Sequence, residues 1–171
     1  RGWETSSDND VLESVWLPNA TSVGEQVFRC TRLVHVSLPV IESIGKSAFW
    51  VCSWLRSVSL DAQFLGDCAF ASCSRLRTVS LPYARFASLS LFERCHNLES
   101  VSMPIATEVR RRSFTECSSL TEVSLPAVRH VGSFAFFYCD KLEAVSFPRL
   151  ESVHRSAFSR CRRLSKERIS V

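Results

Sequence analysis

The residues best equipped for chemistry are eight cysteines, seven of which recur at steps of 21 or 22 residues. The seven are Cys30, Cys52, Cys73, Cys95, Cys117, Cys139 and Cys161. Zinc sites usually draw on close pairs such as Cys-x-x-Cys, which the sequence lacks. Disulfides between neighbouring repeats would need converging Cβ atoms, whereas equivalent positions of stacked repeats point the same way. The pattern therefore favours a column of small buried side chains over metal binding or disulfides.

The other groups that could react do not gather into one site. Cys68 shares its column with Gln26, Ser47, Ser90 and Ser156, so we predict an exposed and reactive thiol there. The four histidines stand in different columns without a nucleophile motif, and no glycine-rich phosphate loop is present. We therefore expect no catalytic, cofactor-binding or metal-binding residues, no small-molecule substrate, and a protein that is not an enzyme.

Other residue types keep the same period, which marks a repeat architecture. Phenylalanines recur at Phe28, Phe49, Phe70, Phe92, Phe114, Phe136 and Phe158. Prolines share a column at Pro18, Pro39, Pro82, Pro104, Pro126 and Pro148. We expect a single domain over residues 1–171, with repeats over about 9–30, 31–52, 53–73, 74–95, 96–117, 118–139 and 140–161 and a partial repeat over 162–171.

One repeat combines a short strand, a bend and a turn. Residues 120–125 alternate apolar and polar side chains around a β-branched centre, which is typical of a half-buried strand. Pro126 has no N–H for a sheet ladder and ends the strand. Residues 132–139 begin with a glycine that permits a tight corner, and their apolar residues are spaced for one or two helical turns.

Stacking such units buries a continuous core that no single unit can form. We predict an α/β solenoid of about seven 22-residue repeats, with a parallel sheet on one face and short helical turns on the other. The sequence contains no apolar stretch long enough to span a membrane. It begins at Arg1 rather than Met, so a processed or truncated start is expected.

The net charge of +4 is mild, and its distribution does not favour nucleic acid. Basic residues do gather in a run, Arg110, Arg111 and Arg112, and towards the end, at Arg155, Arg160, Arg162, Arg163, Lys166 and Arg168. They do not fill one column, however. Opposite charges instead face each other one repeat apart, at Arg77 and Glu99, Arg94 and Glu116, Arg129 and Glu151, and Asp140 and Arg162.

The repeat resembles the BspA-like, or treponemal-type, leucine-rich repeat. Residues 33–39 (Leu-Val-His-Val-Ser-Leu-Pro) and 44–52 (Ile-Gly-Lys-Ser-Ala-Phe-Trp-Val-Cys) carry the resemblance most fully. It implies a right-handed solenoid without catalytic residues, roles in binding or adhesion, and occurrence in surface proteins. Unpaired cysteines would also fit an intracellular location. Ser88 and Arg110 replace the corner glycine, so we expect an irregular convex side there.

We predict a protein-binding or adhesion module whose partner is another protein. Two surfaces are candidates: the outward residues of the strands and the exposed aromatics. The candidate contact residues are Ser80, Ser102, Ser124 and Glu122 on the strands, and Trp50, Trp54, Phe137 and Tyr138 among the aromatics. The alternatives are a structural subunit of a larger assembly and an RNA-contacting protein that uses the arginine-rich end.

Overall fold

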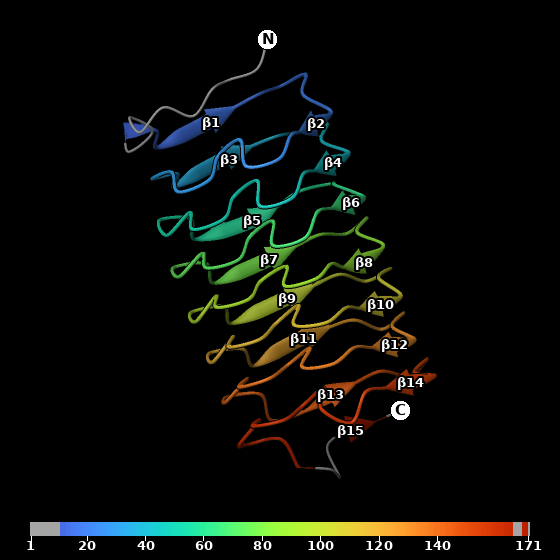
Figure 1. The fold of residues 1–171 in the computed structure, drawn as a ribbon. Coiled ribbons are helices and arrows are strands. Elements are labelled where there is room, and N and C mark those ends of the chain that lie inside the picture. Colours follow the sequence, from blue (N-terminus) through green and yellow to red (C-terminus); the bar gives the residue numbers. More distant parts are fainter. Residues whose placement is uncertain (1–10, 166–168, 171) are drawn as a thin grey trace.

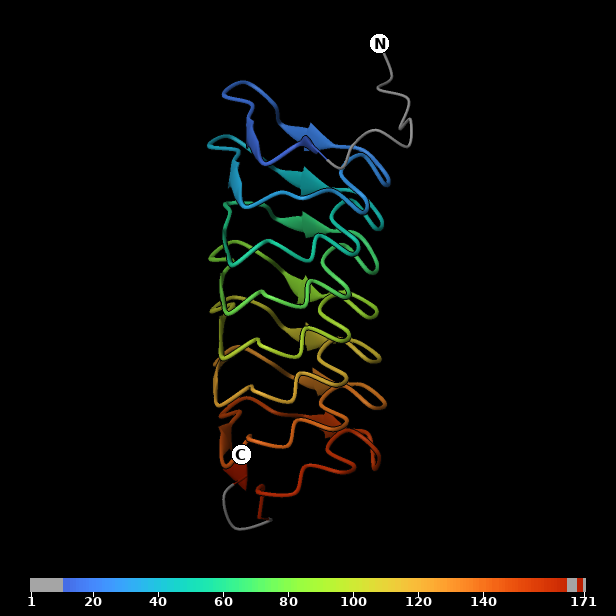
Figure 2. The ribbon, with the colours of Figure 1, turned by 90° about the vertical axis from the view of Figure 1, so that its left-hand side faces the viewer.

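The computed structural model describes residues 11–165 and 169–170, which wind into a parallel-sheet β-solenoid (Figures 1 and 2). Each turn, which we call a rung, contributes one short strand to each of two faces. The strands of the first face are β1 (Ser14–Trp16), β3 (His35–Ser37), β5 (Ser57–Ser59), β7 (Thr78–Ser80), β9 (Ser100–Ser102), β11 (Glu122–Ser124), β13 (Val145–Ser146) and β15 (Ile169–Ser170). The strands of the second face are β2 (Ser22–Val23), β4 (Ser43–Ile44), β6 (Phe64–Leu65), β8 (Phe86–Ala87), β10 (Glu108–Val109), β12 (His130–Val131) and β14 (Ser152–Val153).

The predicted parallel sheet is confirmed on the first face, which we call the main face. In β7, Val79 is buried and pairs with Val101 of the next rung, while Ser80 is exposed and pairs with Ser102. This alternation places valines in the core and serines in solvent, because successive side chains of a strand point to opposite sides. The ladder is continuous from β5 to β11 and is interrupted on either side of that group.

The predicted helical turns are wrong: the described residues contain no α-helix. In six convex turns, two residues four positions apart adopt left-handed backbone, as Ser47 (φ 52°) and Val51 (φ 61°) do. These residues interrupt a right-handed helix. The N–H of Phe49, midway between them, donates to the carbonyl of Ala69 on the next rung at 2.8 Å. Alternate N–H groups of the turn therefore bond to the next rung, and those between them bond within the turn, so no helix forms.

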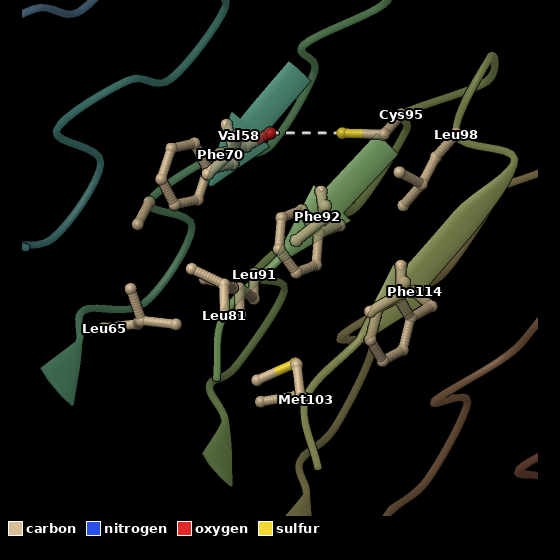
Figure 3. Packing of buried hydrophobic residues seen from close by; sticks show 14 of the residues in the cluster. Val58, Leu65, Phe70, Leu81, Leu91, Phe92, Cys95, Leu98, Met103 and Phe114 are labelled. Carbon is tan, nitrogen blue, oxygen red and sulfur yellow. Dashed lines mark hydrogen bonds between the residues drawn. The ribbon is translucent and has the colours of Figure 1, made fainter. Parts of the chain in front are cut away.

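The core is a column of aromatic rings. Phe49, Phe70, Phe92, Phe114 and Phe136 are fully buried. Neighbouring rings stack with centroids 5.1 to 5.7 Å apart. Figure 3 shows three of them, Phe70, Phe92 and Phe114, on successive rungs, with leucines and Met103 filling the space towards the second face. The phase predicted from the phenylalanine spacing is therefore confirmed.

The corner glycines allow the backbones of neighbouring rungs to approach closely. They are not needed for left-handed backbone, because none of them has positive φ. A Cβ added to Gly45 would lie 2.5 Å from the carbonyl carbon of Gly24 on the preceding rung. The convex turns that follow Ser88 and Arg110, where this glycine is absent, keep the left-handed pair, at Ser90 and Arg94 and at Arg112 and Glu116. The expected convex irregularity is wrong. The interruption falls instead in the second face, between β6 and β8, beside the buried Ser88.

Candidate functional site

The cysteine column lies inside the solenoid and forms a ladder of thiol hydrogen bonds. Cys73 Sγ donates to the Phe49 carbonyl and Cys95 Sγ to the Phe70 carbonyl, each at 3.2 Å and each towards the preceding rung (Figure 3). The same bond recurs at Cys52, Cys117, Cys139 and Cys161. The Phe49 and Phe70 carbonyls also accept the backbone N–H of Cys52 and Cys73. The thiol therefore adds a second hydrogen bond, between rungs, that an alanine side chain could not make.

Cys30 departs from this column, so its predicted burial is wrong. Only one residue separates Phe28 from Cys30, whereas two separate Phe49 from Cys52. Cys30 is consequently exposed, and Thr31 takes the buried position. The Thr31 hydroxyl donates to the Phe28 carbonyl at 2.9 Å, replacing a thiol with another small donor.

Four of the buried thiols are held in the neutral form by raised pKa values. Burial raises the pKa of Cys52 to about 12, and the neighbouring Cys73 adds to the effect. Burial likewise raises the pKa of Cys73, Cys117 and Cys139. Cys68 is half-buried rather than exposed, and burial, followed by the Glu93 and Asp67 carboxylates, raises its pKa as well. The thiolate is the reactive form, so these environments slow reaction.

A hydrogen bond with Cys139 lowers the pKa of Cys161, but its thiol is half-buried. We therefore expect the exposed Cys30 to react faster than the half-buried Cys68 and Cys161. Titration with a thiol reagent at mildly alkaline pH should show a fast phase that Cys30→Ser removes and Cys68→Ser leaves intact. A fast phase that survives Cys30→Ser would contradict this assignment.

The Cys52 thiol makes the stability of the fold depend on pH, because it stabilises the fold while it stays neutral. Its contribution is complete below the unfolded pKa, about 8.5, and is lost as pH rises towards the folded value of about 12.

The outward side of the main face carries small polar side chains. Ser80 and Ser124 are exposed, Ser102 is half-buried, and all three lie in register on adjacent strands. Glu122 is exposed beside them. Large side chains stand at the margins: Trp16 (71% exposed) on the first strand, and Tyr83 (53% exposed) at the corner where the chain leaves β7. The candidate residues of this face thus form one continuous surface.

The other four candidates lie outside this surface, in the turns. Phe137 and Tyr138 are half-buried and meet edge to face with centroids 4.5 Å apart. Trp50 is also half-buried, with the Arg29 guanidinium 4.4 Å from its ring centroid. Trp54 is 39% exposed. Trp50, Phe137 and Tyr138 thus bury much of their surface in packing, and Trp54 is the one exposed side chain of the four.

All four charge pairs predicted from the repeat alignment are confirmed. The nitrogen–oxygen distances are 3.8 Å for Arg77 and Glu99, 3.5 Å for Arg94 and Glu116, 2.6 Å for Arg129 and Glu151, and 3.5 Å for Arg162 and Asp140. Each such exposed pair contributes about 0.2–1 kcal/mol. Within the basic run, Arg110 is paired with Glu108 at 3.0 Å. Lys166 and Arg168 lie outside the described residues.

Sequence reasoning missed an aromatic cluster on the second face. Phe64 (48% exposed) and Phe86 occupy the column where Ser22 and Ser43 stand in earlier rungs. Arg85 lies over the Phe64 ring at 5.5 Å, and Arg110 lies over the Phe86 ring at 4.0 Å. The sequence did hold a signal for this cluster, because Phe64 and Phe86 are aromatic residues in an outward column that is otherwise polar.

Parallel strands, a stacked core and a 22-residue period define a leucine-rich-repeat-like solenoid. The family model for the BspA type leucine rich repeat region matches residues 7–109 and 86–170, with six copies of the repeat. The chain belongs to this family. No curated protein matches it.

Solved bacterial structures share the fold. A leucine-rich repeat protein from Eubacterium ventriosum is 20% identical over 90% of the chain, with a TM-score of 0.76. One from Bacteroides ovatus is 27% identical over 91%, with a TM-score of 0.74. A leucine rich cell surface protein from Faecalibacterium prausnitzii is 28% identical over 87%, with a TM-score of 0.70. The chain spans 46%, 48% and 42% of their respective lengths. No helix of the described residues is long and apolar enough to cross a membrane.

Proposed function

We propose that the chain is a non-enzymatic module that binds another protein through the outward side of its main face. Leucine-rich-repeat folds generally mediate protein–protein interaction. The observation that carries the proposal is the register of Ser80, Ser102 and Ser124, which offers hydrogen-bonding groups on adjacent rungs without a bulky side chain among them.

The margins of this face carry the large anchoring side chains that the serine surface lacks. Interfaces rely on a few aromatic and arginine anchors surrounded by weaker contacts. Tyr83 and Trp16 offer exposed aromatic rings, and Arg56 and Arg77 stand immediately before β5 and β7. A partner lying across the strands would therefore meet polar contacts in the middle and anchors at both sides. Adhesion is one form that such binding takes, and the cell-surface naming of the Faecalibacterium prausnitzii relative is consistent with it.

A structural role in a larger assembly is the second candidate. The aromatic cluster of the second face favours it, because Phe64 (48% exposed) and the half-buried Phe86 present their rings on successive rungs. Exposed apolar groups of this kind mark interaction sites. Paired charges along the stack do not favour the RNA-contacting alternative.

The test replaces Ser80, Ser102 and Ser124 together with arginine. The assay captures the partner that the unaltered chain retains from an extract of the cells that produce it. Three bulky like charges on neighbouring strands should abolish this capture. No core residue changes in the variant. The matched control replaces Phe137 and Tyr138 with serine and should capture that partner normally. A melting curve of each variant separates lost binding from lost folding, because adjacent like charges repel. Normal capture by the folded arginine variant, with loss in the control, would move the contact surface to the turns.

A further inference from the structure

Beside the start of β5 and β7, three arginines gather around one tryptophan. We call this group the basic corner: Arg32, Arg56 and Arg75 with Trp54. Buried Leu55 separates Trp54 from Arg56, so both point outward from one rung. Arg75 lies over the Trp54 ring at 3.7 Å and Arg32 lies 5.9 Å from the same ring. The indole thus sits between guanidinium groups from the rungs before and after it.

Within the part of the chain that the structure describes, the three arginines of the basic corner have no acidic partner. All are exposed, and none lies within 4 Å of a carboxylate among the residues that the structure describes. Elsewhere on the stack such pairing is common, as between Arg163 and Glu143 at 3.3 Å. Stacking on an aromatic ring occupies the flat side of a guanidinium and leaves its N–H groups free in the plane. Those donors match a carboxylate in paired geometry.

The geometry points to an acidic segment of a partner protein, docked with its carboxylates on the basic corner and continuing over the serines of the main face. This inference rests on the proposed function and names the chemistry of its partner. Ser57 follows Arg56 directly and begins β5, so the basic corner and the main face are one surface.

The size of the basic corner favours a short acidic segment over a long polyanion. Its arginines span three rungs, or about 10 Å at the spacing of parallel strands. The next rung brings Glu99 into the column of Arg56 and Arg77, because the Glu99 N–H donates to the Arg77 carbonyl. A nucleic acid or a sulfated glycan carries charge along its whole length and would meet this carboxylate, whereas a protein segment can end its acidic residues there.

The experiment uses a fluorescein-labelled peptide that begins with a short run of glutamates and continues with serine and alanine. The chain should bind this peptide and not its glutamine counterpart, and added salt should weaken the binding. Replacing Arg32, Arg56 and Arg75 with glutamine should weaken binding on the order of tenfold, from three exposed charge pairs. The control replaces Arg111, Arg112 and Arg155 with glutamine, which removes equal charge from the other side and should leave binding unchanged.

Three results would overturn the inference. One is equal loss of peptide binding in both arginine variants, which indicates general attraction to net charge. Another is binding that does not depend on the glutamates. The third is a heparin fragment held more tightly than the peptide and released by the Arg32, Arg56 and Arg75 variant, which would assign the corner to a sulfated glycan. None of these affects the serine-face test, in which the chain captures its own partner, so the two proposals fail separately.

Discussion

Phe114→Ala is expected to destabilise the fold by about 3–5 kcal/mol, the cost of removing a large buried aromatic side chain. The Phe114 ring is fully buried and stacks between Phe92 at 5.5 Å and Phe136 at 5.1 Å. In a solenoid each rung contacts only its neighbours, so a cavity at one rung weakens two interfaces at once. Chemical denaturation of the purified chain measures the loss.

Arg111→Ala is the matched control for this truncation. Arg111 lies on the exposed side of the same convex turn, so its removal should change stability by no more than about 0.5 kcal/mol. Similar small losses for both variants would mean that the phenylalanine column does not hold the rungs together.

Gly45→Ala is expected to cost about 1–3 kcal/mol or more, because overpacking against backbone leaves no soft neighbour to move. The added methyl would lie 2.5 Å from the Gly24 carbonyl carbon and 2.7 Å from the Glu25 nitrogen. Those atoms belong to the preceding rung, so the two rungs would have to separate.

Gly24→Ala isolates the effect of that contact. Gly24 occupies the same column, but a methyl there would meet only Val27 Cγ2, at 3.4 Å. Loss of unfolded-chain freedom should then change stability by less than about 1 kcal/mol, in the stabilising direction. Thermal melting of the two alanine variants compares them directly, and equal destabilisation would refute close rung approach as the reason for glycine at this corner.

The period and the core could be predicted from sequence because they depend on side-chain burial. Phenylalanines such as Phe70 and Phe92 must face inward in every rung, so their spacing reports the stacking directly. Charge pairs such as Arg129 and Glu151 followed from the same alignment.

The turn geometry could not be predicted in this way. Left-handed backbone at Val51 and Tyr138 gives no compositional signal, since β-branched and bulky residues rarely adopt it. Bonds between rungs hold these residues there: the Val51 N–H donates to the Ala71 carbonyl at 2.9 Å. Apolar spacing alone therefore suggested a helix. The burial of Cys30 was mispredicted for a related reason: its step to Cys52 is regular, and only the shorter spacing from Phe28 moves it out of the core.

The most direct measurement of the binding face is site-specific photo-cross-linking. A photoreactive amino acid is placed at Ser102, in the middle of the main face, or at Arg111, on the exposed side of the turns. We expect an adduct between the chain and its captured partner from position 102 and none from position 111. An adduct from position 111 alone would contradict the main face as the contact surface.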